Sequence, residues 1–94
     1  MAAYVIVEVD ISDPEKYNAY KELTPATVLA FGGRFVLRGQ PVTVLEGEWN
    51  HERLVMLKFP TKEKAEAWYN SEGYQHAKSV RSEAAKANFL LIES

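Results

Sequence analysis

Hydrophobic residues alternate with other residues near the start of the chain, in the segment AYVIVEVD at residues 3–10. The alternation creates two faces, one with Ala3, Val5, Val7 and Val9 and the other with Tyr4, Ile6, Glu8 and Asp10. A period of two among residues of high β-propensity predicts a strand. Because apolar side chains occur on both faces, we expect the strand to be covered on both sides.

Two further extended segments are predicted in the middle of the chain. Residues 34–38 form the second strand, and residues 39–41 (Gly-Gln-Pro) should kink or bulge it, because proline cannot donate to a central ladder. Extended structure is expected to resume over residues 42–48. It should turn at residues 50–52 and return as a third strand over residues 53–59, so that these two segments form a hairpin.

The first helix has clear start and stop signals. Asp13 is suited to the N-cap and Pro14 to the first helical position. Gly32–Gly33 should end the helix, because glycine adopts the left-handed conformation that helix C-termini favour. Within this segment, Thr24–Pro25 predicts a kink or a break, since proline lacks the N–H that the helix needs.

A second helical region follows the third strand. Thr61 should cap a helix that runs to about Asn70, with Trp68 and Tyr69 facing inward. A break is expected at residues 71–73, followed by further helix over residues 74–85. Residues 88–92 complete the pattern as the last strand.

The order β-α-β-β-α-β predicts one ferredoxin-like α+β domain over residues 1–94. Right-handed crossovers then place the helices on one face of a four-stranded antiparallel sheet. The other face stays uncovered although it is apolar. The simplest cover in so short a chain is a second copy related by two-fold symmetry, so we expect a homodimer whose sheets form a dimeric α+β barrel.

The run from Gly32 to Arg81 contains a specific series of motifs, which are GGRFVLRG, LEGEW, RLVMLKFP and AEAWYNSEGYQHAKSVR. Together with the DP..Y..Y spacing at residues 13–20, this series resembles the domain-of-unknown-function family 1330, within the dimeric α+β barrel superfamily. The resemblance covers essentially the whole chain. It implies a ferredoxin-like subunit in a two-fold barrel, and it implies no particular reaction. Related barrels include cofactor-independent monooxygenases, lactone isomerases and haem-dependent enzymes.

Composition and charge exclude several classes of function. The net charge is −2 and the lysines and arginines are scattered, so nucleic acid is not an expected partner. The N-terminal segment lacks the positive region of a signal peptide, and no apolar run approaches the ~20 residues that span a bilayer. We therefore expect no membrane association and a cytoplasmic location. The absence of cysteine excludes disulfides and thiolate chemistry.

The two histidines do not suggest a metal site. His51 lies in the predicted turn and His76 in the last helical segment, without the short spacing of paired metal ligands. Both are expected to be exposed. No metal and no cofactor are expected.

Arg38 and Glu46 are the candidate catalytic residues. If the second strand alternates regularly, Arg34, Val36 and Arg38 share a face, and a buried arginine needs a carboxylate such as Glu46 or Glu8. The pair could orient a substrate and transfer a proton. It could equally be an ion pair that holds the barrel or the dimer together.

The candidate ligand-binding residues are aromatic. Polar-tipped rings can line a small-molecule pocket, and they can also fill a core. They are Tyr17, Tyr20, Trp68, Tyr69 and Tyr74. For Arg81 we expect a surface pair with a nearby glutamate.

Two hypotheses about function remain open. The first is a homodimer that binds a small organic molecule between its sheet and helices and catalyses proton transfer or oxygenation without a tight cofactor. The second is a non-enzymatic ligand-binding or structural module whose polar interior fixes the dimer.

Overall fold

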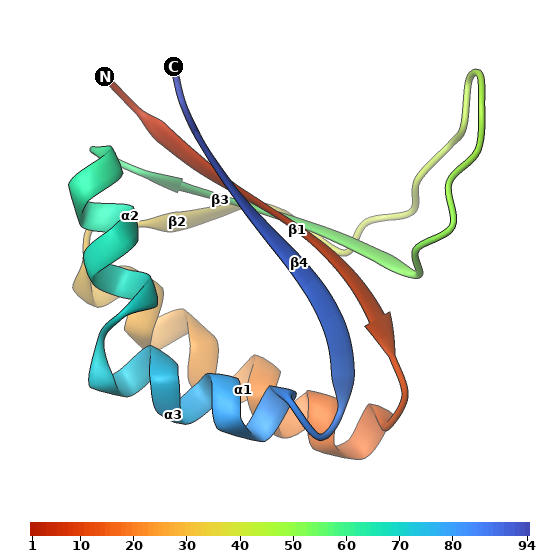
Figure 1. Cartoon of the computed structure of the whole chain (residues 1–94), viewed down its shortest axis with the longest axis horizontal. Helices are drawn as coiled ribbons and strands as arrows, with labels where there is room; N and C mark the ends of the chain where they lie inside the picture. Colours follow the sequence, from red (N-terminus) through yellow and green to blue (C-terminus); the bar gives the residue numbers. More distant parts are fainter.

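One antiparallel sheet organises the chain, and a computed structural model describes all 94 residues. The strands lie in the order β2-β3-β1-β4. They are β1 (Ala3–Ile11), β2 (Arg34–Arg38), β3 (Arg53–Phe59) and β4 (Ala85–Glu93). The helices are α1 (Pro14–Ala30), α2 (Lys62–Tyr69) and α3 (Glu72–Arg81), and all lie on the same side of the sheet (Figure 1). The predicted ferredoxin-like fold is confirmed, with its second helical region divided as expected.

The sheet presents two different faces, as the alternation predicts. Its inner face meets the helices and buries Val5, Val7, Val9, Val55, Leu57 and Phe59. Helical side chains complete this single core, among them Tyr17, Val28, Trp68 and Tyr74. Burial of these side chains supplies the main driving force for the fold.

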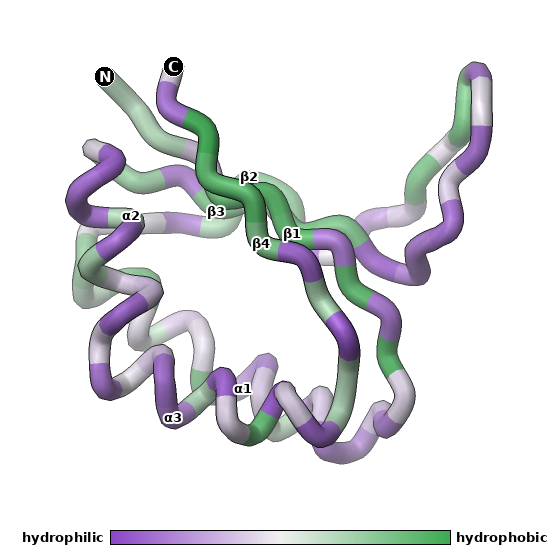
Figure 2. The backbone as a smooth tube through the Cα atoms, viewed as in Figure 1, coloured by the Kyte–Doolittle hydropathy of each residue, from purple (hydrophilic) through white to green (hydrophobic).

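The outer face of the sheet has no helix over it. The strand register places apolar side chains side by side there, with Ile6 opposite both Met56 and Leu90. Leu90 and Ile92 are each 50% exposed. The hydrophobic stretch of β4 is visible in Figure 2. The outer face, which we define by Tyr4, Ile6, Leu37, Leu54, Met56, Leu90 and Ile92, is therefore unpartnered within one subunit.

Helix α1 continues through Pro25, so the break that the sequence predicted as one of two outcomes does not occur. Proline leaves the carbonyl of Lys21, four residues earlier, without its helical donor. The guanidinium of Arg38 donates to this carbonyl at 2.9 Å. The Thr24 hydroxyl also donates to the carbonyl of Tyr20, at 2.7 Å. A residue from a distant strand thus replaces the hydrogen bond that proline removes.

Strand β2 departs from regular alternation. Its register with β3 shifts between Phe35 and Leu37, which is a β-bulge. Arg34 lies opposite Lys58, whereas Arg38 lies opposite the buried Val55. The expectation that Arg34 and Arg38 share a face is therefore wrong, because the extra residue reverses the side on which the following side chains point.

The expected hairpin over residues 42–48 is also wrong. Strand β2 ends at Arg38, and Gly39 turns the chain out of the sheet with a φ of 81°. We call residues 40–50 the arm; it contains no strand and projects on the side away from the helices (Figure 1). Without a neighbouring strand, and with Pro41 lacking an N–H, the arm has no ladder to join. Its Leu45 is 95% exposed.

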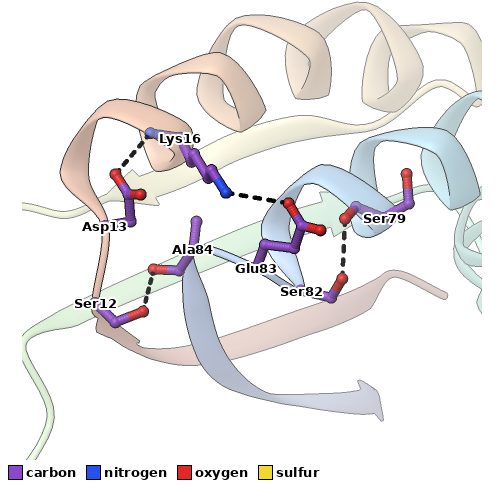
Figure 3. A network of polar contacts seen from close by, with 7 residues as sticks. All are labelled: Ser12, Asp13, Lys16, Ser79, Ser82, Glu83 and Ala84. Atoms are coloured by element: carbon purple, nitrogen blue, oxygen red, sulfur yellow. Dashed lines mark hydrogen bonds and ion pairs between the residues drawn. The ribbon is translucent and has the colours of Figure 1, made fainter.

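Polar contacts fix the start of α1 beside the α3–β4 connection (Figure 3). Asp13 caps α1 as predicted, accepting from the Lys16 N–H at 3.2 Å. The Lys16 ammonium lies 3.2 Å from Glu83, and the Ser12 hydroxyl donates to the carbonyl of Ala84 at 3.0 Å. These contacts hold the first turns of α1 against the end of α3. The helix expected to reach residue 85 ends at Arg81, and no helix is long and apolar enough to cross a membrane.

Candidate functional site

A small cavity, which we call the inner cavity, lies between the inner face of the sheet and the helices. Its volume is about 30 Å³. A buried water needs roughly 10–15 Å³ on this measure, so the space suits about two waters or one small polar group. Most of its walls are apolar. Its polar lining comes from the helices and the end of β2–β3, namely Tyr17, Tyr20, Lys21, Thr24, Arg38, Arg53 and Arg81.

A larger, open cleft lies against the inner cavity, and we call it the mouth. It has a volume of about 460 Å³ and no apolar residue in its lining. Lys21, Arg38 and Arg53 line both the mouth and the inner cavity, so the two spaces adjoin at these three residues. Asn18 and Glu22 complete the mouth. Three of its five residues are cations and one is an anion.

Arg81 is buried at the inner cavity without a charge partner. Arg81 is 7% exposed, and its buried Nε atom donates to no acceptor. No carboxylate lies within 4.0 Å of its guanidinium nitrogens. The expected surface pair with a glutamate is wrong, because Glu83 pairs with Lys16 instead (Figure 3). The guanidinium carbon lies 4.8 Å from the ring centre of Phe89. An unpaired charge in such a place is costly.

Two tyrosines join their hydroxyls beside this arginine. The oxygens of Tyr20 and Tyr74 are 2.9 Å apart, and both side chains are buried. Burial raises the pKa of the Tyr20 phenol and that of the Tyr74 phenol, and the nearby charge of Arg81 opposes these increases only in part. Both phenols are therefore protonated at neutral pH. They can donate hydrogen bonds, and they cannot serve as bases there.

The other aromatic candidates occupy three different positions. Tyr17 lines the inner cavity, and burial raises the pKa of its phenol although the Arg53 charge opposes this. Trp68 is 1% exposed, lines the cavity, and donates from Nε1 to the Thr27 hydroxyl at 3.1 Å. Tyr69 is half-buried and lines a separate hollow between α2 and β4. The fold thus brings Tyr17, Tyr20 and Trp68 to one cavity with Tyr74 directly behind, and it leaves Tyr69 outside.

Arg38 does not meet the carboxylates expected for it. The β-bulge brings its side chain to the mouth, where the guanidinium carbon lies 4.4 Å from the ring centre of Phe35. Glu46 lies exposed in the arm, and Glu8 lies 3.4 Å from His51. The predicted pairing of Arg38 with Glu46 or Glu8 is wrong within the subunit, because the chain leaves the sheet at Gly39 instead of forming a hairpin.

The two histidines differ from each other. His76 is exposed as predicted. His51 is half-buried, contrary to expectation, and its Nδ1 lies 3.1 Å from Asp10 while its Nε2 lies 3.4 Å from Glu8. These contacts attach the residue that follows the arm to β1. No group of three acidic or histidine side chains is arranged to hold a metal ion.

Sequence reasoning missed Arg53 and gave Arg81 the wrong environment. Arg81 follows the buried Tyr74 and Ala77 at helical spacing, which places it on the inward stripe of α3. Periodicity could therefore have found it. Arg53 reaches the mouth by passing over Gly39, where a Cβ atom would lie 2.6 Å from the arginine Cζ. That close approach depends on the fold and has no local marker apart from the glycine.

The site's chemistry follows from its donors. No carboxylate and no imidazole lines the inner cavity. The polar groups that remain are guanidiniums, the Lys21 ammonium, the Thr24 hydroxyl and protonated phenols, and such donors stabilise negative charge on oxygen. The residues present can bind and polarise a ligand, but none of them is a general base at neutral pH.

Solved structures with the same fold cover almost the whole chain. A protein of unknown function from Rhodopseudomonas palustris is 17% identical with a TM-score of 0.79, over 99% of this chain and 82% of that one. A dimeric ferredoxin-like protein of unknown function from Jannaschia sp. CCS1 is 13% identical with a TM-score of 0.69, and the match covers 100% of both chains. SnoaB, a cofactor-independent oxygenase from Streptomyces nogalater, is 10% identical with a TM-score of 0.67, over 99% of this chain and 92% of that one. These similarities establish the fold.

Among proteins with curated functions, none matches this sequence. The family-level comparison agrees with the resemblance that the motifs between Gly32 and Arg81 suggested. It matches residues 2–94, which is nearly the full chain, to the family described as Domain of unknown function (DUF1330). The chain therefore belongs to the DUF1330 family.

Proposed function

We propose that this protein is a homodimer that binds a small organic molecule through the inner cavity and its mouth. The observation that carries the proposal is the buried guanidinium of Arg81, whose Nε has no hydrogen-bond partner, in a cavity with mostly apolar walls. Ligand sites combine apolar walls with a few convergent polar groups, and this cavity has that composition. Tyr17, Tyr20 and Trp68 form its walls, Tyr74 supports Tyr20, and Arg38 stands at the entrance.

The outer face supports the homodimer. Exposed apolar side chains run across neighbouring strands there, and a contiguous apolar surface of this kind marks an interaction site. The arm extends on the same side, and its Val42, Val44 and Leu45 are exposed. Two outer faces packed by two-fold symmetry would bury these surfaces and leave each inner cavity accessible through its own mouth. The cytoplasmic location remains a prediction from sequence.

Cofactor-independent oxygenation is a second candidate function. SnoaB, which shares the fold, is described as a cofactor-independent oxygenase. The cavity's donors would stabilise a substrate that reacts as its own oxyanion, and such a reaction needs no base from the protein if the substrate ionises unaided. Proton abstraction by Glu46 is not part of this proposal, because Glu46 lies in the arm and does not line the cavity.

Backbone amide NMR spectra test ligand binding directly. We would titrate the protein with a set of small aromatic alcohols, ketones and carboxylic acids. Binding compounds should shift the amides of Tyr20, Thr24 and Leu57, which line the inner cavity and not the hollow around Tyr69. Shifts confined to the hollow around Tyr69, or no saturable shifts with any compound, would contradict the proposal. Oxygen uptake with bound phenols would separate an oxygenase from a binding protein.

Sedimentation velocity tests the dimer. Leu90→Asp places a charge on the outer face and should shift the protein toward monomer. Leu29→Asp makes the same change at an exposed leucine on α1, where the residue is 74% exposed, and should leave the assembly unchanged. A monomeric parent protein at micromolar concentration would refute the dimer.

A further inference from the structure

We infer that the ligand is a small carboxylate, held at its charged end by Arg81 in the inner cavity. This inference rests on the proposed small-molecule function and adds the chemical class of the ligand and the residue that selects it. Three features support it: the state of Arg81 on α3, the charge of the mouth, and the size and polarity of the inner cavity.

The first feature is the state of Arg81 itself. Its Nε atom is buried and unpartnered, and the whole chain offers it no carboxylate within 4.0 Å. A guanidinium presents a rigid, planar fork of N–H donors, which matches the two oxygens of a carboxylate. A side-on carboxylate would satisfy the free Nε donor and neutralise the buried charge together. Neutral ligands could satisfy the donor but would leave the charge uncompensated.

The second feature is the charge of the mouth. Lys21, Arg38 and Arg53 face it, and Glu22 is the only anion in its lining. The Nε of Arg53 is also buried without a partner. A cleft lined by one sign of charge attracts ligands of the opposite sign and raises their association rate. An anion therefore meets favourable charge both at the entrance and at the base of its path.

The third feature is the size and polarity of the inner cavity. Its volume of about 30 Å³ admits a charged head group, whereas the mouth of about 460 Å³ can hold the rest of the molecule. The hydroxyls of Tyr20 and Tyr74 are hydrogen-bonded to each other. Only Tyr20 of this pair lines the cavity, and when Tyr74 donates to it, the Tyr20 O–H is free to donate to an anionic oxygen.

The alternative role for Arg81 is structural. Its guanidinium packs near the rings of Phe89 and Tyr20, at 4.8 Å and 5.9 Å from their centres. Cation–π contacts of this kind stabilise a folded protein modestly. The two roles predict opposite effects for Arg81→Met, which keeps an unbranched apolar stem and removes the charged guanidinium. A structural arginine stabilises the unliganded protein, whereas a ligand-binding arginine without a partner destabilises it.

The test compares benzoate with benzamide, which has nearly the same shape but no charge. Thermal unfolding and isothermal titration are measured for the full-length parent, Arg81→Met and Arg81→Lys at one protein concentration. In the parent protein we expect benzoate to raise the melting temperature saturably and benzamide to bind at least about tenfold more weakly, as loss of a charge-assisted pair entails. Arg81→Met should melt at the same or a higher temperature than the parent and lose the response to benzoate. Arg81→Lys, which keeps the charge but loses the fork, should bind benzoate with intermediate affinity.

Three outcomes would overturn the inference. Equal affinity for benzoate and benzamide would leave the small-molecule site intact while refuting the carboxylate class. A lower melting temperature for Arg81→Met with an unchanged benzoate response would make the arginine structural. Binding of neither compound, together with an absence of saturable NMR shifts from the wider compound set, would refute the proposed function as well. If Arg81→Met does not fold, the benzoate–benzamide comparison in the parent and Arg81→Lys still decides the matter.

Discussion

Truncation of Trp68 should be among the most destabilising single changes in this protein. The side chain is 1% exposed and lies between α2 and the sheet, with its ring centre 4.3 Å from that of Tyr74 and 5.3 Å from that of Phe59. Replacement of a buried tryptophan by alanine costs about 3–5 kcal/mol, through lost transfer energy and the cavity left behind. Rigid aromatic neighbours cannot collapse into the space, so we expect a loss near the upper end of that range.

One companion variant separates the contribution of the Trp68 ring from that of its hydrogen bond, and a second serves as a control. Trp68→Phe keeps an aromatic ring and removes the Nε1 donor to Thr27, so it should lose about 1–2 kcal/mol. Trp49→Ala is the control, because Trp49 is half-buried in the arm and packs only against His51 among the aromatic rings. Its free energy of unfolding should fall by less than about 1 kcal/mol.

Urea unfolding followed by far-UV circular dichroism measures these changes. All variants must be compared at one protein concentration, because the stability of a dimer depends on the concentration of its subunits. A loss below about 1 kcal/mol for Trp68→Ala would contradict the packing described here, since only surface substitutions are normally so small.

Three further predictions concern the site's framework. Arg38→Met should lower the free energy of unfolding in urea by about 0.5–1.5 kcal/mol, because it removes the donor to the Lys21 carbonyl. This loss should shrink in a Pro25→Ala background, where the helix regains its own N–H. An unchanged loss would mean that Arg38 does not substitute for the hydrogen bond that Pro25 removes. Gly39→Ala should destabilise the protein more than Gly47→Ala, because both glycines have a positive φ but only Gly39 is crowded by Arg53. Equal losses of unfolding free energy would show that Arg53 does not lie over Gly39. Since burial raises the pKa of Tyr20 and of Tyr74 above the unfolded value of 10.0, the unfolded state releases their protons first as pH rises, and stability should fall above about pH 10. Urea titrations between about pH 8 and pH 11 should show a smaller fall for Tyr20→Phe than for the parent, and an equal fall would refute the assigned burial.

The alternation of apolar residues made the fold predictable. Val5, Val7 and Val9 occupy the inner face as expected, and Ile6 occupies the opposite face with Met56 and Leu90. The caps at Asp13 and Thr61 also form as predicted. These features depend on residues close in sequence or on a simple period, which is why they can be read from one chain.

The site was less predictable because it depends on contacts between distant segments. A single extra residue in β2 brings Arg38 to the inner side, and nothing near it in the sequence marks the bulge. Pro25 fits within α1 only because Arg38 supplies a hydrogen bond from another element. Arg81 has the helical spacing of a core residue, but a charged residue type argues against burial unless a partner is present.

A crystal structure of the protein grown with benzoate tests the central claim most directly. We expect two copies packed through their outer faces, with the benzoate carboxylate against the Nε side of Arg81 and the ring in the mouth beside Lys21, Arg38 and Arg53. A structure in which Arg81 instead pairs with a carboxylate of the protein, while the inner cavity is filled by side chains and excludes benzoate, would contradict it.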